Sequence, residues 1–245
     1  MNIKDIFPDE QPIPFCSDIS EKLDTRRQKF KADKGLLEGD PIRIDIENIM
    51  ELPDGKIRID INGARFECFF HSGSTKKMYV VFNGARLMKD GQMNPIPRFS
   101  RWSYHAFSEY TWLSIDDPTY FDNDNVICGW YYGTRDKNYR EYAAYLVGKI
   151  CDFLNIEKDN VYFFGGSAGG TAAIHIAVLF GHGVALSING QFNFEYNHAY
   201  ITNYTQYTGL DLHEKDKYDR NDLVKIMTDA GNKVKFILIE NCQSK

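Results

Sequence analysis

The residues best suited to chemistry lie where an apolar stretch meets an alanine-rich one. Residues 161–164, Val-Tyr-Phe-Phe, lead into a Gly-Gly-Ser-Ala-Gly-Gly turn at 165–170, and an Ala- and Ile-rich stretch follows. A strand, a turn of the form G-x-S-x-G and a helix, in this order, hold a serine in a strained conformation with its hydroxyl exposed. Glycine and alanine surround it because larger side chains would collide in so sharp a turn. The pattern predicts that Ser167 is a nucleophile.

The same turn predicts part of an oxyanion site. A helix that begins just after Ser167 directs its first amides, among them that of Ala168, toward negative charge that develops on a bound acyl group. Two alternatives stay open, since glycine and serine are common residues. The turn could be glycine-rich only for close packing, or it could cradle a phosphate. A P-loop would need Gly-Lys-Ser or Gly-Lys-Thr, which this sequence lacks.

Length and composition favour a single domain. A chain of 245 residues can bury one large α/β core, and we expect an N-terminal arm and helix over 1–40 followed by one domain over 41–245. A net charge of −5 with scattered basic residues argues against nucleic-acid binding. Five cysteines without a C-x-x-C pair indicate a reducing compartment, so we expect a soluble cytoplasmic protein without a metal site. No stretch reaches the ~18 apolar residues of a membrane span.

Hydrophobic periodicity predicts the elements that position Ser167. Alternating isoleucines at 42–46 and 57–61 predict a hairpin around Pro53-Asp54-Gly55, and Asn62-Gly63 predicts a second tight turn into 65–70. An antiparallel meander therefore precedes a buried strand at 78–82. Further strands are expected at 111–114, 126–128, 160–164, 184–188 and 234–239, and helices at 18–34, 136–154, 168–180 and 219–230. Their alternation is typical of βαβ units.

Several polar and aromatic residues follow the expected strands and could contact a ligand. Trp130 and Tyr131 could stack on a sugar, although such rings also fill cores. Gln191 could orient a catalytic histidine or a substrate hydroxyl, or it could simply face solvent. Arg98 and Arg101 could clamp an anionic acceptor, or they could stack on neighbouring aromatic rings.

Together these stretches resemble the α/β-hydrolase superfamily, and within it the bacterial capsule-biosynthesis and glycan O-acetyltransferases, which include accessory Sec system proteins. The likeness runs from about Met78 to the end of the chain, and its specific parts are residues 82–85, 129–133, 164–170 and 187–191. It implies a mostly parallel sheet with helices on both faces. It also implies that Ala85 or Gly84 supplies a second oxyanion amide, with an ordinary Asn-Gly turn as the alternative.

The resemblance implies serine-dependent acyl transfer or ester hydrolysis on a carbohydrate through an acyl-serine intermediate. The acceptor would be a carbohydrate or another small molecule, and acetyl-CoA is a possible donor, with no cofactor held permanently. The sequence does not identify a protein partner. The alternative is a non-catalytic glycan-binding or scaffold protein in polysaccharide biosynthesis, which would keep the turn for packing.

The chain departs from the superfamily pattern at its end. In that pattern an acid follows the strand expected at 234–239, and a histidine follows one more strand and helix. Glu240 is the candidate acid, whereas His105, His198 and His213 are candidate bases. His175 lies eight residues beyond Ser167 in the same expected helix, about 12 Å along the axis, and is expected only to pack. We therefore expect a C-terminally shortened chain with little turnover and an apolar strip along its last strand.

Overall fold

The computed structural model describes residues 33–86, 88–89, 92–192, 198–212, 220, 222–229 and 233–241. The chain divides into two compact units, residues 1–35 and 36–245, and the second unit contains the sheet and Ser167. Almost all of the arm and helix predicted before residue 35 lies outside the described residues.

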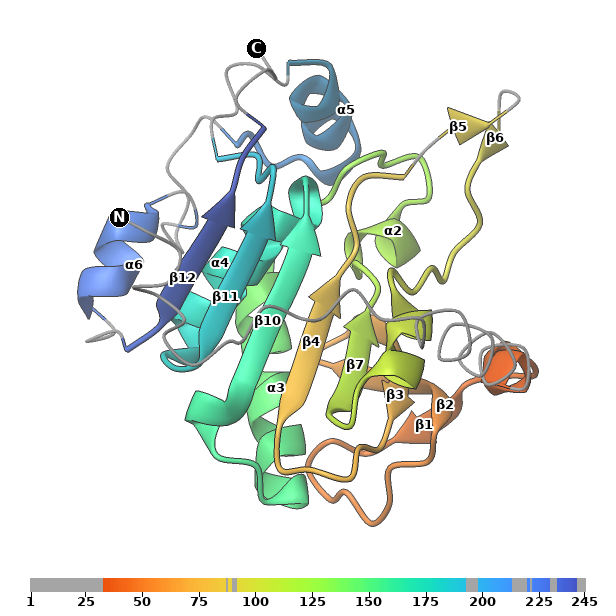
Figure 1. The fold of residues 1–245 in the computed structure, drawn as a ribbon. Coiled ribbons are helices and arrows are strands. Elements are labelled where there is room, and N and C mark those ends of the chain that lie inside the picture. Colours follow the sequence, from red (N-terminus) through yellow and green to blue (C-terminus); the bar gives the residue numbers. More distant parts are fainter. Residues whose placement is uncertain are drawn as a thin grey trace, which may run out of the picture. The chain divides into compact units, whose positions relative to one another are not determined.

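Eight strands of the described chain form one sheet in the order β1-β2-β3-β7-β4-β10-β11-β12 (Figure 1). All neighbouring pairs are parallel except those that β3 makes with β2 and β7. The strands are β1 (Ile42–Ile44), β2 (Gly55–Ile61), β3 (Ala64–His71), β4 (Met78–Phe82), β7 (Thr111–Ile115), β10 (Val161–Gly166), β11 (Val184–Ile188) and β12 (Lys235–Ile239). The carboxyl ends of β7, β4, β10, β11 and β12 therefore share one edge, where ligands bind in open α/β sheets.

Of the two turns predicted near the start of the sheet, only the second is a hairpin. Asn62 and Gly63 join β2 to antiparallel β3 with φ values of 49° and 74°, which is the left-handed backbone that a type I′ turn requires. The hairpin predicted around residues 53–55 is wrong, because β1 pairs with β2 in parallel. After β1 the Asp45 carboxylate accepts a hydrogen bond from the Glu47 amide at 3.0 Å, and the chain returns to the other end before β2 begins.

The middle of the sheet also differs from a simple meander. Strand β7 lies between β3 and β4, so the chain skips one position after β3 and fills it later. The strand predicted at 126–128 is wrong. The Ile127 amide donates to the Asn203 side chain at 2.9 Å, and its carbonyl accepts from the Arg86 amide at 2.7 Å. These loop contacts occupy the groups that a sheet neighbour would use.

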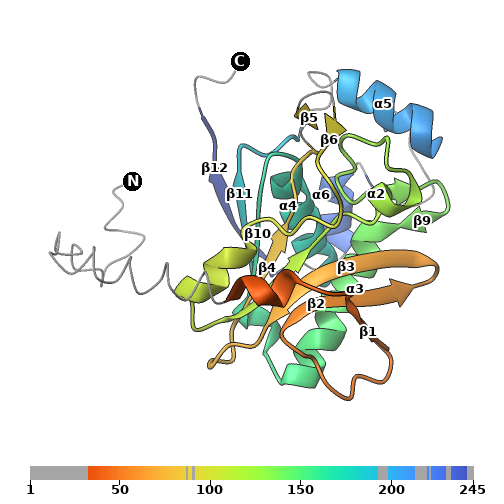
Figure 2. The same ribbon diagram turned by 90° about the vertical axis from the view of Figure 1, so that its right-hand side faces the viewer.

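Helices α3 (Tyr139–Leu154) and α4 (Ala168–Phe180) cover one face of the sheet (Figure 2). On the other face, Phe69, Val81, Phe99 and Trp112 form a smaller core with the segment around the 3-10 helix Trp102–Phe107. The remaining described elements are α2 (Thr119–Asp122), α5 (His198–Thr208), α6 (Leu223–Asp229), the strand pairs β5 (Met88–Lys89) with β6 (Gln92–Met93) and β8 (Gly133–Thr134) with β9 (Lys137–Asn138), and the 3-10 helices Lys34–Leu37 and Lys158–Asn160.

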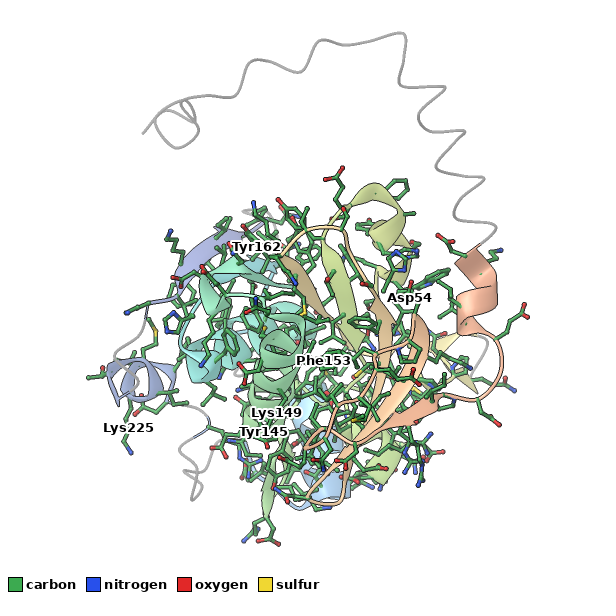
Figure 3. The ribbon with its side chains drawn as sticks, turned by 90° about the horizontal axis from the view of Figure 1, so that it is seen from below. Asp54, Tyr145, Lys149, Phe153, Tyr162 and Lys225 are labelled. Carbon is green, nitrogen blue, oxygen red and sulfur yellow. The ribbon has the colours of Figure 1, made fainter. Side chains whose placement is uncertain are left out.

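The outer side of α3 faces away from the Ser167 turn. Tyr145 and Lys149, labelled in Figure 3, both bond the Glu47 carboxylate and line a hollow of about 400 Å³ between α3 and α4. Phe153, near the end of this helix, is 41% exposed. None of the residues that line the hollow belongs to the turn around Ser167, so the hollow is separate from the candidate site.

Strand β12 closes the described part of the sheet with an apolar surface. Four of its side chains, those of residues 236–239, are between 37% and 56% exposed. The predicted apolar strip along the last strand is therefore confirmed. Within the described residues, no helix is long and apolar enough to cross a membrane.

Candidate active site

Ser167 occupies the strained turn that the sequence predicts. It lies between β10 and α4 with φ 54° and ψ −127°, a region that residues other than glycine rarely adopt. Its amide donates to the Ile188 carbonyl of β11 at 2.9 Å, and its own carbonyl accepts from the amides of Gly170 and Thr171. Such backbone strain costs on the order of 1–3 kcal/mol and persists where the surrounding structure enforces it. Its hydroxyl makes no hydrogen bond to any described residue.

The glycines around Ser167 allow three backbone segments to touch. A Cβ atom on Gly165 would lie 2.1 Å from the Gly169 carbonyl oxygen, and one on Gly169 would lie 2.5 Å from the Phe82 carbonyl oxygen. The turn is thus glycine-rich for close packing, as one alternative interpretation of the motif proposes. Packing does not account for a positive φ at Ser167, which is not a glycine.

The loop after β4 lies directly against the serine. A Cβ on Gly84 would be 3.3 Å from the Gly166 carbonyl oxygen and 3.9 Å from the Ser167 Cβ. The amides of Gly84 and Ala85 make no hydrogen bond within the part of the chain that the structure describes. Helix α4 begins at Ala168, whose amide has no partner inside the helix. Three amides for which the described chain provides no hydrogen-bond acceptor therefore flank the Ser167 turn.

Arg98 orients this loop. Its guanidinium donates to the Gly84 carbonyl at 2.8 Å and to the Ala85 carbonyl at 3.1 Å. Because a trans peptide is planar, the Ala85 N–H points away from the Gly84 carbonyl and hence away from Arg98. The sequence suggested that Arg98 clamps a substrate, whereas in the structure its guanidinium contacts the loop that would bind an oxyanion.

A buried polar network around Asn83 fixes the same loop. The Asn83 side chain donates to the Arg98 carbonyl and to the Asp116 carboxylate, and it accepts from the Ser100 amide at 2.8 Å. The Tyr131 hydroxyl accepts from the Asn83 amide at 2.9 Å and donates to the Ile115 carbonyl at 2.6 Å. Sequence reasoning missed the role of Asn83 and Asp116, although an acidic pair directly after an apolar strand is a usable signal.

Two aspartates in this network titrate far from their usual range. Burial raises the pKa of Asp116 to about 7, although hydrogen bonds from the Arg98 amide, Asn83 and the Asp117 amide oppose the shift. Burial likewise raises the pKa of Asp117 to about 6, against a bond from the Tyr131 amide. Neither carboxyl is exposed to solvent. Their hydrogen bonds support the loop.

The residues expected to contact a ligand are placed in three different ways. Trp130 and Tyr131 are fully buried, which corrects the expectation that they stack on a sugar. The Gln191 side chain accepts from the Trp130 indole N–H at 2.9 Å, and its backbone bonds the Thr171 hydroxyl in the first turn of α4. Arg101 is half-buried beside the turn, with its guanidinium stacked 4.6 Å from the centre of the Phe164 ring.

A polar hollow of about 590 Å³ lies beside α2, close to the loop after β4. The Tyr120 hydroxyl, from a residue that lines the hollow, donates to the Gly84 carbonyl at 3.4 Å. The other lining residues include the acidic and amide side chains of residues 122–125. The carboxylate and amide groups of these four consecutive residues can bond several hydroxyl groups.

Comparison with solved structures finds matches at low sequence identity. A chain of the Glycosylation Associate Protein (Gap123) complex from Streptococcus agalactiae matches with a TM-score of 0.53 and 16% identity, over 75% of this chain and 36% of that one. The capsule O-acetyltransferase of Neisseria meningitidis serogroup A matches with a TM-score of 0.51 and 19% identity, over 85% of this chain and 91% of its own. An esterase from Thermogutta terrifontis matches with a TM-score of 0.42 and 12% identity, over 75% and 81%.

The fold is that of an α/β hydrolase. No family model and no curated protein matches the sequence. The chain spans about a third of the length of the streptococcal protein, 36%.

With the α/β-hydrolase fold established, the candidate acid falls at the expected edge. Glu240 follows β12, and its carboxylate accepts from the Gly190 amide at 3.2 Å. Gly190 comes two residues after β11, the strand next to β10. Glu240 therefore lies at the same edge of the sheet as Ser167, although no described contact joins the two.

The histidines of the described chain do not complete a triad in this arrangement. His105 is buried at the opposite edge, 4.4 Å ring to ring from His71, which pairs with Trp112 near the start of β7. It is excluded as the base for Ser167.

His175 packs inside α4 and bonds Arg140, and burial lowers its pKa, which confirms the expected packing role. His198 begins α5 and is exposed, whereas His213 lies outside the described residues.

Proposed function

We propose that this chain is a serine acyltransferase or esterase that acts on a carbohydrate. The observation that carries the proposal is the geometry of Ser167, a residue held at φ 54° against a loop whose Gly84 and Ala85 amides are unpaired within the described chain. That combination of a half-buried serine, whose hydroxyl has no described hydrogen-bond partner, and nearby free donors suits attack on an acyl carbonyl.

The reaction would run through an acyl-serine. The Ser167 oxygen attacks the carbonyl carbon of the donor and its proton passes to a base, for which His198 and His213 are the candidates. The amides of Ala85 and Ala168 donate to the oxyanion of the tetrahedral intermediate, and Gly84 is the alternative donor in the loop. The protonated leaving group departs, and a sugar hydroxyl or water then attacks the acyl-serine and restores the free serine.

Two findings support a carbohydrate as acceptor. A polar hollow lined by the acidic and amide side chains of residues 122–125 lies next to the Gly84 loop, and such groups suit sugar hydroxyls. One structural relative is a capsule O-acetyltransferase. We propose acetyl-CoA as donor, since acetyl transfer to a glycan needs an activated acetyl group.

Intact-mass spectrometry tests the first chemical step. Incubation with acetyl-CoA or 4-nitrophenyl acetate should add one acetyl group to the wild type and none to Ser167→Ala. Ser72→Ala removes an exposed hydroxyl far from the turn and should acetylate like the wild type. An adduct that persists in Ser167→Ala, or one that never forms on the wild type, would refute Ser167 as nucleophile.

A non-catalytic glycan-binding or scaffold role is the second candidate. The observation that favours it is that the Ser167 hydroxyl bonds no histidine among the described residues. A glycan-array measurement separates the two roles. Binding that is the same for the wild type and Ser167→Ala, together with no acetylation of the wild type, would support the scaffold role.

A further inference from the structure

Among the residues that the structure describes, Arg101 is a cation without a charged partner beside the Ser167 turn. We propose that it binds a phosphate group of the ligand on which Ser167 acts, an inference that rests on the proposed function. A Cβ atom placed on Gly166, the residue before Ser167, would lie 3.3 Å from a terminal nitrogen of the Arg101 guanidinium. Glycine at 166 therefore leaves the space that brings this charge next to the serine.

The face of the Arg101 guanidinium is covered while its donors remain unused. It stacks on the Phe164 ring at 4.6 Å, a contact that uses the plane of the group and leaves the N–H edge available. Within the described chain it makes no hydrogen bond and no ion pair. Arg98, three residues earlier, donates to the carbonyls of Gly84 and Ala85. A half-buried guanidinium without a partner loses part of its hydration, which costs free energy. An anionic ligand group bound to Arg101 would offset this desolvation cost.

The backbone holds Arg101 in this place under strain. Its φ of 54° lies in the left-handed region, and hydrogen bonds hold both the preceding residue and the carbonyl of Arg101 itself. The Ser100 amide donates to the Asn83 side chain at 2.8 Å, and the Tyr104 amide donates to the Arg101 carbonyl at 2.9 Å. Positioning of this kind is frequent where a side chain must meet a ligand.

The chemistry of the group selects phosphate. A guanidinium offers parallel N–H donors that match two oxygens of a phosphate, and the nearby N-terminus of α4 adds a partial positive charge. The net charge of the chain is −5, so this attraction is local and not a property of the whole surface. The phosphate could belong to the acyl donor or to a glycosyl phosphate acceptor.

Ligand binding to Ser167→Ala tests the inference without turnover. Titration calorimetry would compare 4′-phosphopantetheine with pantetheine, and glucose 1-phosphate with glucose, so that each pair differs by one phosphate. Arg101→Gln should weaken binding of the phosphorylated member of one pair at least tenfold and leave its neutral partner unchanged. Arg101→Lys keeps the positive charge but loses the parallel N–H donors. Its affinity for the phosphorylated ligand should lie between those of the chain with Arg101 and of Arg101→Gln. The pair that responds identifies donor or acceptor as the source of the phosphate.

Arg43→Gln is the matched control, because it removes an exposed positive charge on β1, at the far end of the sheet order. It should leave all four affinities unchanged. Equal loss for the phosphorylated and neutral members in Arg101→Gln, no loss for either, or no preference of Ser167→Ala itself for phosphate would overturn the inference. A phosphate preference that depends on Arg101 in a chain that never acetylates would uphold Arg101 as a phosphate-binding residue and refute the proposed function.

Discussion

Replacement of Gly165 by alanine tests the contact between β10 and α4 on which the Ser167 turn depends. The new Cβ would lie 2.1 Å from the Gly169 carbonyl oxygen and 2.2 Å from its carbonyl carbon. Real carbon–oxygen contacts exceed about 3 Å, so the first turn of α4 must move by about 1 Å. Overpacking costs about 1–3 kcal/mol, and the rigid backbone on both sides places this variant near the upper figure.

The expected effect on thermal stability follows from chain length. About 3 kcal/mol lowers the Tm of a domain of this size by roughly 6–12 °C. Gly148→Ala is the matched control, because Gly148 lies within α3 and a Cβ there meets nothing within 4 Å. That variant should gain about 0.5–1 kcal/mol, since alanine is the better helix former.

Differential scanning fluorimetry of both variants beside the wild type provides the measurement. Since α4 carries the Ala168 amide, Gly165→Ala should also lower the rate of Ser167 acetylation. If Gly165→Ala melts within about 1 °C of the wild type while Gly148→Ala gains stability, the close approach of β10 and α4 does not exist and the packing explanation of the glycines is wrong.

Two further substitutions, at Asp116 and Tyr131, test the buried polar network around Asn83. Burial raises the pKa of Asp116 to about 7, above the pKa of this group in the unfolded chain. The protonated Asp116 carboxyl therefore contributes its full stabilisation at low pH. The free energy of unfolding then falls by about 1.4 kcal/mol per pH unit between roughly pH 4 and 7. Urea titrations should show that the free energy of unfolding differs less between pH 5 and pH 7 for Asp116→Asn than for the wild type. An equal difference in both proteins would contradict the raised pKa of Asp116. Tyr131→Phe leaves the Asn83 amide and the Ile115 carbonyl unpaired, which should cost about 1–3 kcal/mol and slow acetylation. Tyr145→Phe, the same change at an exposed site, should alter stability by less than about 0.5 kcal/mol, and equal losses in both variants would refute the network's role.

The sequence is most informative where structure is local. The turn at Ser167, helix α4 and the Asn62-Gly63 hairpin each depend on a few consecutive residues, and all three are confirmed as structural elements. The strands β7, β11 and β12 are also predicted within a residue, because short, mostly apolar runs bounded by polar residues are typical of strands.

The errors concern pairing between distant segments. Alternating isoleucines show which side chains of β1 and β2 are buried but not whether the strands run in the same direction, so the pattern predicts a hairpin where the pair is parallel. Aromatic residues after an apolar run give no sign that Trp130 and Tyr131 are buried. Their burial depends on Tyr204 and on the Asn83 amide, which are far away in the sequence.

The bonds that join the Gly84 loop to the segment before Arg101 have a thermodynamic consequence for a ligand that contacts both. Asn83 bonds Ser100, and Arg98 bonds Gly84, so hydrogen bonds hold the proposed oxyanion donors of the loop and the segment before Arg101 together as one rigid unit. Two recognition points held at a fixed separation act like a chelate: once the first is engaged, the second binds at a high effective concentration. A ligand whose phosphate and acyl carbonyl match that separation gains affinity from both contacts, whereas shorter or longer ligands engage one at a time.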